Sequence, residues 1–155
     1  MGKYKAGRPA AFVFDLDGTL IDSGLDIAIS ANFVRVHFGL PELPVELVRS
    51  YVGDGVAKLA ERVLGHDVEK GVTGSGGLAV DEDRLAEAMT VFFDHYGRHL
   101  LDNTHLYPGV LEVLARYRSI PMHLATNKPR VFTDVILEGL HIAAAFDRVV
   151  CGDEA

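Results

Sequence analysis

Apolar and polar positions divide the chain into two kinds of pattern. A short apolar run at 10–14 is typical of a buried strand, and similar runs follow at 120–125 and 146–151. Between the first run and residue 101, apolar residues recur at spacings of three and four, which predicts helices at about 25–36, 45–51, 56–65 and 81–101. Two further helices are predicted at about 110–115 and 131–140, so strands and helices alternate toward the end of the sequence.

The helical spacings also predict which faces are buried. The first helix is expected to bury Leu25, Ile29, Asn32, Phe33 and Val36, and the fourth Leu85, Ala88, Met89, Phe92, Tyr96 and Leu100. In the last helix the apolar positions are Val131, Phe132, Val135, Ile136 and Leu140. The Gly-rich stretch at 71–77 is interpreted as a linker between helices, because it lacks the Lys-Ser/Thr ending of a phosphate-binding loop.

Alternating strands and helices predict an α/β fold, in which helices cover a parallel sheet. The helical block at 22–101 is too long for a simple crossover between neighbouring strands. We therefore expect two units: an α/β core made of residues 1–21 and 102–155, and an inserted helical cap made of residues 22–101.

Two carboxylates, Asp15 and Asp17, come directly after the first strand, and Gly18 follows them. Side chains at i and i+2 of an extended segment point to the same side, so both carboxylates can face one crevice. Burying two unpaired carboxylates is costly, and the pair therefore needs a cation, hydrogen-bond donors or water. Magnesium takes carboxylate, carbonyl and water oxygens, which makes Mg²⁺ the expected ion.

Composition restricts the class of protein. The 155 residues are 48% hydrophobic and 24% charged, with 15 basic and 22 acidic side chains and a net charge of −7. This balance is typical of a globular protein and lacks the basic surface of a nucleic-acid-binding protein. No apolar run is long enough to span a membrane. A single cysteine, Cys151, excludes an internal disulfide and is compatible with a reducing compartment, so a cytoplasmic location is expected.

Two segments carry a family resemblance. The sequence Asp-Leu-Asp-Gly-Thr-Leu at 15–20 resembles the first motif of the haloacid dehalogenase superfamily, in its phosphatase form. The sequence Ala-Thr-Asn-Lys-Pro at 125–129 resembles the second motif, as found in phosphoglycolate phosphatases and their close relatives. The resemblance implies a Rossmann-like core with a helical cap inserted after the first strand. It also implies Mg²⁺-dependent hydrolysis of a small phosphorylated metabolite through a phosphoaspartyl intermediate.

By this resemblance, Asp15 is the nucleophile, and Asp17 protonates the leaving group and then activates water. Asp15 and Asp17, the latter through its main-chain carbonyl, are the expected Mg²⁺ ligands. Thr126, Asn127 and Lys128 are expected to bind the phosphate, although Thr126 also fits a helix cap.

The cap loop at 52–55 resembles the Gly-containing cap loop of phosphoglycolate phosphatases. Arg49, just before this loop, has two interpretations. It either faces a substrate carboxylate or is a solvated helix residue.

The family pattern continues beyond the third strand with a Lys and an acidic motif, which residues 152–155 do not supply. The core is therefore expected to be incomplete at its C-terminal side, with the strand at 10–14 at a sheet edge and Lys128 as a surrogate cation. One alternative hypothesis is a catalytically impaired protein whose exposed edge is covered by a partner chain, with a homodimer left open. A phosphotransferase on the same scaffold is a further alternative.

Overall fold

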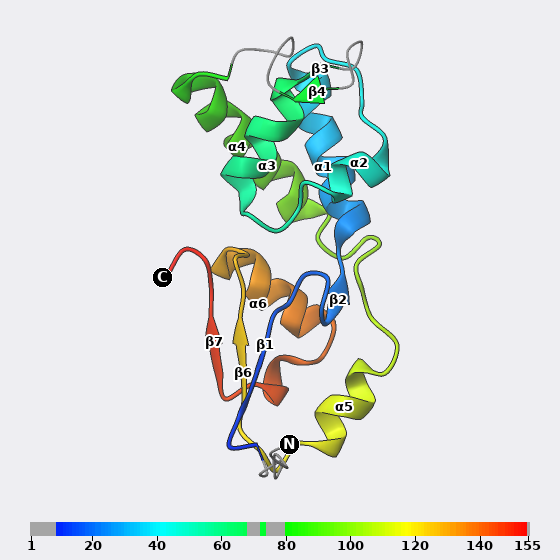
Figure 1. Ribbon diagram of the computed structural model, residues 1–155, viewed down its shortest axis with the longest axis vertical. Helices are drawn as coiled ribbons and strands as arrows, with labels where there is room; N and C mark the ends of the chain where they lie inside the picture. Colours follow the sequence, from blue (N-terminus) through cyan, green and yellow to red (C-terminus); the bar gives the residue numbers. More distant parts are fainter. Residues whose placement is uncertain (1–8, 68–71, 74–79, 155) are drawn as a thin grey trace, which may run out of the picture.

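A computed structural model describes residues 9–67, 72–73 and 80–154. Figure 1 shows two parts of the molecule, one built around a sheet and one built of helices. The chain passes between the two parts twice, once before α1 (Gly24–His37) and once after α4 (Glu82–Arg98). This arrangement places the connections and the ends of the sheet strands at the junction of the two parts.

Three parallel strands form the sheet. They are β1 (Phe12–Phe14), β6 (Met122–Ala125) and β7 (Arg148–Val150), in the spatial order β1-β6-β7. Phe14 lies opposite Leu124, and Leu124 lies opposite Val149. The predicted parallel α/β sheet is thus confirmed, with each strand shorter than its apolar run.

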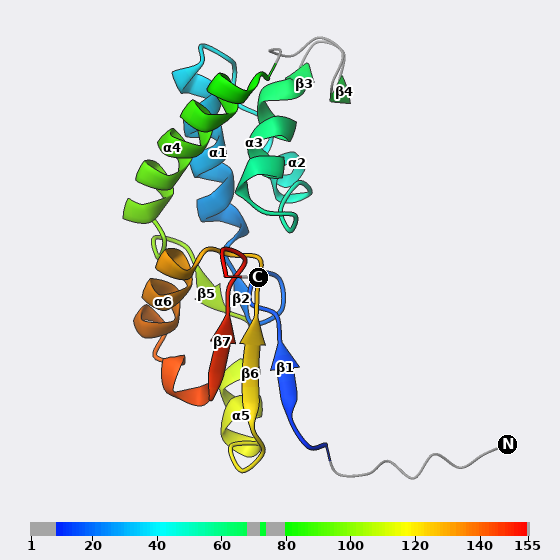
Figure 2. The ribbon, with the colours of Figure 1, turned by 90° about the vertical axis from the view of Figure 1, so that its left-hand side faces the viewer.

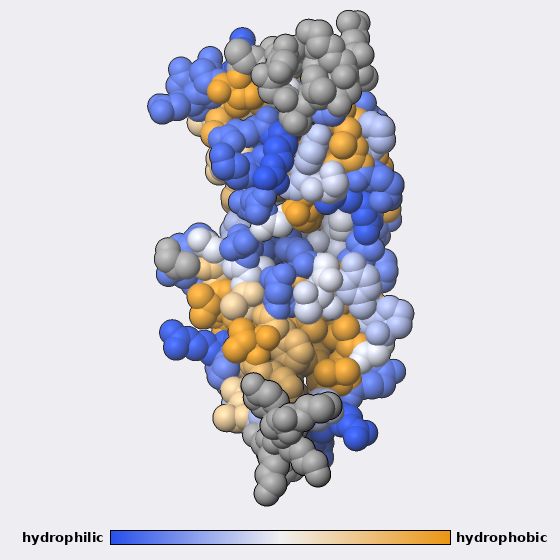
Figure 3. All heavy atoms as spheres, viewed as in Figure 1, coloured by the Kyte–Doolittle hydropathy of each residue, from blue (hydrophilic) through white to orange (hydrophobic). Residues whose placement is uncertain are grey.

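The strand β1 lies at the edge of this sheet, as predicted, with no neighbour on its other side among the described residues. Val13, in the middle of β1, is 67% exposed. Figure 3 shows apolar residues gathered on the face of the sheet-bearing part that is turned to the viewer. The edge therefore carries both unpaired backbone groups and exposed apolar surface.

Two helices and a short 3-10 turn complete the sheet-bearing part: α5 (Val110–Arg116), α6 (Arg130–Gly139) and η1 (Ala143–Ala145). Helix α6 buries Phe132, Ile136 and Leu137. Val131 and Val135 are exposed, so the predicted apolar face of this helix is only partly right.

The helical part consists of α1 (Gly24–His37), α2 (Val45–Arg49), α3 (Val56–Gly65) and α4 (Glu82–Arg98). A short antiparallel pair, β3 (His66–Asp67) and β4 (Val72–Thr73), lies beyond α3 in Figure 2. The prediction of a linker at 71–77 is incomplete, because residues 72–73 form β4; the other residues of this stretch lie outside the described ones. None of the described helices is both long and apolar enough to cross a membrane.

The buried face predicted for α1 is only partly right, because Asn32 is buried but three of the apolar residues are not. Ile29, Phe33 and Val36 are 44%, 48% and 55% exposed. The buried positions of α1 combine apolar, small and polar side chains: Asp26, Ile27, Ala28, Ser30, Ala31, Asn32, Val34 and Arg35.

These buried polar groups have partners. Asn32 exchanges two hydrogen bonds with the Leu43 backbone, and the Arg35 guanidinium donates to the carbonyls of Pro41 and Val63. The apolar spacing identifies the buried face of α1 only in part, because polar groups with hydrogen-bond partners occupy several of its buried positions.

Two short strands join the two parts. They are β2 (Ile21–Asp22) and β5 (His105–Leu106), which pair antiparallel with Ile21 opposite Leu106. Asp26 then accepts hydrogen bonds from the backbone amides of Asn103 and Thr104, at 3.0 and 2.8 Å. The paired connections lie beside both boundaries of the predicted cap, although the division into domains stays a prediction.

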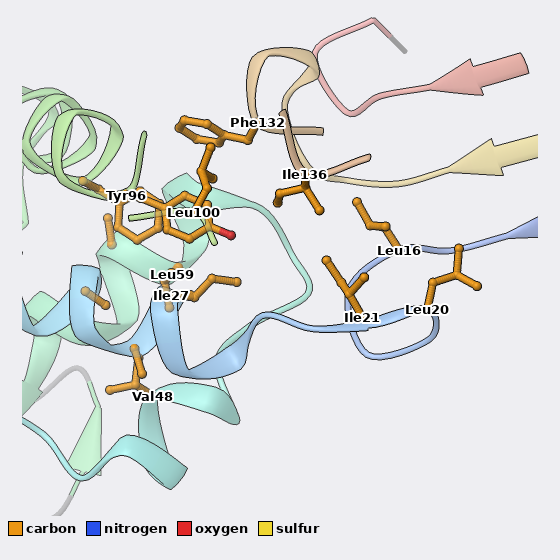
Figure 4. Packing of buried hydrophobic residues seen from close by; sticks show 14 of the residues in the cluster. Leu16, Leu20, Ile21, Ile27, Val48, Leu59, Tyr96, Leu100, Phe132 and Ile136 are labelled. Atoms are coloured by element: carbon orange, nitrogen blue, oxygen red, sulfur yellow. The ribbon is translucent and has the colours of Figure 1, made fainter. Parts of the chain in front are cut away.

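The hydrophobic core continues through the junction. Figure 4 shows Tyr96, Leu100 and Phe132 near one another, with Ile136 and Leu16 toward the sheet. Tyr96 comes from α4 and Phe132 from α6, and their ring centroids are 5.1 Å apart. Aromatic packing therefore holds the helical part against the sheet-bearing part.

Candidate active site

A cavity of about 250 Å³ lies at the junction of the two parts. All five residues predicted to act in catalysis or phosphate binding line it: Asp15, Asp17, Thr126, Asn127 and Lys128. The helical part contributes Arg49, Val52, Gly53, Gly55, Val56, Leu59, Phe92 and Tyr96. The structure thus brings together residues that are more than 100 positions apart in the sequence.

The sheet explains this meeting. Strands β1 and β6 are parallel neighbours, so their carboxyl ends lie at the same edge, where α/β proteins bind ligands. Asp15 follows β1 directly, and Thr126 follows β6 directly. Gly18 has a positive φ of 78°, and its amide donates to the Ile21 carbonyl at 2.9 Å. The chain thus turns sharply at Gly18, directly after the two carboxylates.

Two donors hold one oxygen of Asp17. The Ser23 hydroxyl donates to Asp17 Oδ1 at 2.5 Å, and Lys128 Nζ lies 3.3 Å from the same oxygen. Ser23 stands at the N-cap position of α1, but its side chain makes no capping hydrogen bond. The Ser23 hydroxyl therefore does not cap α1. It holds the Asp17 carboxylate in its orientation instead.

The ammonium group of Lys128 is inside the molecule, with the residue only 7% exposed. Its Nζ donates to the Tyr96 hydroxyl at 2.9 Å and lies 4.8 Å from the centre of the Tyr96 ring. Burial works against the charge, but nearby Asp17 and Tyr96 outweigh it, and the pKa of Lys128 lies above its ordinary value of 10.5. The pKa of Tyr96 is also raised, and in this case burial of the hydroxyl is the main cause. The site therefore holds a permanent cation beside Asp17.

The loop after β6 is shaped by its own hydrogen bonds. The Thr126 amide donates to the Val150 carbonyl at 3.0 Å, and Thr126 Oγ1 accepts from the Lys128 amide at 3.2 Å. The N-cap of α6 is Pro129, so Thr126 does not cap that helix. Because its oxygen accepts from the backbone, the Thr126 hydroxyl proton is available to a ligand.

Asn127 connects this loop to the helical part. Its Nδ2 donates to the Gly53 carbonyl at 2.9 Å, and both residues line the cavity. Gly152 packs against the backbone of Asn127 so closely that a Cβ at position 152 would overlap it. The Asn127 backbone is thus fixed from one side and its side chain from the other.

Arg49 is neither free nor fully solvated. Its NH2 group donates to both oxygens of Asp22, and it lines the cavity. The Arg49 partner lowers the pKa of Asp22, and Asp22 in turn raises the pKa of Arg49.

Few side chains in the cavity could act as metal ligands. Asp15 and Asp17 both line the cavity, but no group of three or more His, Cys, Asp or Glu side chains among the described residues is arranged to hold a metal. Mg²⁺ commonly keeps several waters and uses one or two carboxylates together with substrate phosphate. The two aspartates fit that kind of site, and they do not form an all-protein cage.

Tyr96 is a functional candidate that the sequence pattern missed. Its spacing in α4 assigns it to the apolar stripe, and it is indeed 1% exposed. A buried tyrosine hydroxyl needs a hydrogen-bond partner, and that requirement was the available signal that Tyr96 faces a polar group. The identity of the partner, Lys128, depends on the tertiary structure.

Comparisons with known proteins agree with this geometry. A family described as "Haloacid dehalogenase-like hydrolase" matches residues 12–155. A phosphoglycolate phosphatase of Nitrosospira multiformis is 38% identical over 145 residues, which cover 92% of this chain and 60% of the relative. A phosphoglycolate phosphatase of Vibrio parahaemolyticus is 39% identical over 142 residues, or 90% of this chain and 60% of the relative. The chain thus spans about 60% of the length of these curated relatives.

Solved structures share the fold. A predicted phosphoglycolate phosphatase from Haemophilus somnus matches with a TM-score of 0.83 and 28% identity, covering 94% of this chain and 64% of that one. CbbY from Rhodobacter sphaeroides, solved in complex with phosphate, matches with a TM-score of 0.71 and 18% identity over 94% of this chain and 64% of that one. The second likeness concerns the fold alone.

Proposed function

The chain belongs to the haloacid dehalogenase-like hydrolase family, and we propose that its cavity serves the hydrolysis of a small phosphate monoester of the phosphoglycolate type. One observation carries the proposal: two carboxylates after β1 and the Thr126–Lys128 loop after β6 line the same cavity. The names of the curated relatives support the substrate class. They do not favour the alternative of an impaired protein defined by a partner-covered sheet edge.

The reaction is proposed in two steps. Asp15 attacks phosphorus, an Asp15 oxygen–phosphorus bond forms, and the bond from phosphorus to the substrate oxygen breaks. Asp17 gives its proton to the departing alkoxide. Asp17 then takes a proton from water, whose oxygen attacks the phosphoaspartate, so that inorganic phosphate leaves and the Asp15 carboxylate is restored.

The surrounding groups suit these roles. Ser23 and Lys128 both contact Oδ1 of Asp17, which leaves Oδ2 to exchange the proton. Lys128 and the Thr126 hydroxyl supply a cation and a donor for phosphate oxygens, which the net charge of −7 makes necessary. Asp15 and the Asp17 carbonyl would hold Mg²⁺, which supplies further positive charge against the phosphate.

Arg49 is proposed to act at the other end of the substrate. It lines the cavity from the helical part, and Asp22 holds one of its nitrogens in place. The remaining guanidinium donors suit the carboxylate of a phosphoglycolate-like substrate. The ion pair reduces the side-chain freedom that binding would otherwise have to remove.

The test is hydrolysis of phosphoglycolate and of an aryl phosphate by this chain, with Mg²⁺ and with chelator. Turnover that needs Mg²⁺ and falls at least about 1000-fold in Asp15→Asn would support the proposal, because loss of a nucleophile removes the covalent route. Asp17→Asn should lower the rate of phosphoglycolate hydrolysis more than that of the aryl phosphate, because the alkoxide of phosphoglycolate is the poorer leaving group. Turnover that survives Asp15→Asn would refute the assigned nucleophile.

A further inference from the structure

We propose that Tyr96 of α4 is a positioning residue that holds the Lys128 ammonium at the phosphate site. The inference rests on the proposed function, because it assigns Lys128 to the phosphate. The inference goes further than that function, because a residue of the helical part then determines where the positive charge of Lys128 lies. Tyr96 does not contact the reacting atoms in this account and acts through Lys128.

The contact is direct and buried. Tyr96 OH lies 2.9 Å from Lys128 Nζ, and Tyr96 and Lys128 are 1% and 7% exposed. The Tyr96 ring stacks on Phe92 at a centroid distance of 5.3 Å and meets Phe132 edge-on at 5.1 Å. With one ring from each part of the molecule against it, the tyrosine has little freedom to move its hydroxyl.

Lysine needs such a partner more than arginine would. Its side chain is a flexible four-carbon stem that carries a compact charge, and nothing in the stem fixes the ammonium. Asp17 alone would draw Nζ into a simple ion pair, at 3.3 Å in this structure. The Tyr96 hydroxyl provides a second acceptor on the side of the helical part and so holds Nζ between α4 and the turn after β1.

The donor count leaves room for the ligand. A lysine ammonium has three N–H donors. The hydroxyl of Tyr96 and Oδ1 of Asp17 are the acceptors near Nζ among the described residues. The third N–H remains for a phosphate oxygen, and the cavity that holds Lys128 also holds Thr126.

The position of Tyr96 has a structural consequence. Tyr96 belongs to the helical part, whereas Lys128 belongs to the loop after β6. The cation is therefore held in place by the packing of α4 against α6, through Tyr96 and Phe132. Loss of the hydroxyl alone should leave this packing intact and release only the ammonium.

The experiment is a double-mutant cycle read by calorimetric binding of inorganic phosphate, with Tyr96→Phe, Lys128→Met and the double variant. Tyr96→Phe should weaken phosphate binding about ten- to a hundredfold, the range that corresponds to one hydrogen bond to a charged group. In the Lys128→Met background, Tyr96→Phe should have no further effect. Tyr117→Phe is the matched control, since Tyr117 is 36% exposed and lies outside the cavity lining; it should bind phosphate like the wild type.

Three outcomes would overturn the inference, and they differ in what else they refute. If Tyr96→Phe binds phosphate like the wild type while Lys128→Met does not, the positioning role is wrong and the proposed function stands. Equal losses in both backgrounds would show a merely structural effect of the hydroxyl, again leaving the proposed function intact. If the folded wild-type chain neither binds phosphate nor hydrolyses phosphoglycolate, the proposed function fails and the inference fails with it.

Discussion

Arg49 and Asp22 form an ion pair that joins α2 to β2, with Arg49 NH2 2.9 and 2.8 Å from the two carboxylate oxygens. The amide of Gly24 donates to the same Asp22 at 3.0 Å. A Cβ at position 24 would lie 2.8 Å from the Arg49 guanidinium carbon, so the absence of a side chain at Gly24 makes room for the pair. The pair thus lies at the connection through which the chain enters the helical part.

The Arg49–Asp22 pair should make stability depend on acid. The pKa of Asp22 is lowered in the folded protein, chiefly by the hydrogen bond from Arg49, so the unfolded chain binds a proton more readily. The contribution is therefore present above the ordinary pKa of 3.8 and is lost as the pH falls through the lower, folded value. In urea unfolding, Arg49→Met should cost about 1 kcal/mol or less at pH 6 and less at acid pH, because the pair is partly solvated.

The control for this prediction is Arg98→Met. Arg98 pairs with Asp94 on the exposed face of α4, where the two side chains are 71% and 61% exposed. Its removal should change stability by no more than a few tenths of a kcal/mol. Equal effects of the two substitutions would show that the Arg49 pair is an ordinary surface contact.

His95 should add a second pH dependence. Its ring stacks on Phe33 at 4.2 Å and Nδ1 lies 3.0 Å from the Ser30 hydroxyl, on the side where α4 meets α1. Burial, and secondarily the neighbouring His99, lower the pKa of His95 below 6.5. As the pH falls below 6.5 toward that value, the unfolded chain takes up a proton first, and stability declines. Over this window the free energy of unfolding should fall more steeply in the wild type than in His95→Gln, and parallel slopes would contradict the prediction.

The fold was more predictable than the packing of its helices. Short apolar runs located β1, β6 and β7, since such a run bounded by turn residues is typical of a strand in a parallel sheet. The buried face of α1 was predicted only in part, because polar residues such as Arg35 are buried there, with the Val63 carbonyl as a partner. Such partners come from residues distant in sequence, and no local period encodes them.

The candidate site likewise contains residues that the sequence predicts and residues whose roles depend on tertiary packing. Asp15, Asp17 and Thr126 come just after apolar runs that predict parallel strands, so local sequence is sufficient to place them at one sheet edge. The direction of Lys128 and the role of Tyr96 depend on how α4 packs on α6, which local sequence does not determine.

Gly152 should tolerate no side chain. A Cβ there would overlap the backbone of Asn127, and backbone atoms cannot move aside as a flexible side chain can. Gly152→Ala should lower stability by about 2 kcal/mol and weaken phosphate binding, because it displaces the loop that carries Thr126.

Gly97→Ala is the matched control for Gly152→Ala. Gly97 lies in α4, and the nearest atom to an added Cβ is 3.5 Å away, which is ordinary contact. Alanine in a helix is better than glycine by about 0.5–1 kcal/mol, so this variant should be more stable than the wild type in urea unfolding. A gain in stability from both substitutions would show that the loop after β6 moves freely away from Gly152.

The exposed edge strand should promote self-association. Val13 is 67% exposed on β1, and a lysine on an edge strand disfavours pairing with another chain. Val13→Lys should reduce concentration-dependent association in sedimentation velocity. Val36→Lys places the same charge on α1, at a residue that is 55% exposed and away from the sheet. Association that falls equally in both variants would point to net charge, and not to the β1 edge.

The most direct test of the account is to find the atom that carries the phosphoryl group. The chain is incubated with phosphoglycolate and Mg²⁺, quenched, and treated with borohydride, which reduces an acyl phosphate on aspartate to homoserine. Peptide mass spectrometry should then show homoserine at position 15, with Asp17 unchanged and no conversion in Asp15→Asn. Turnover without modification at Asp15, or with the modification at Asp17, would contradict the assignment of Asp15 as the nucleophile.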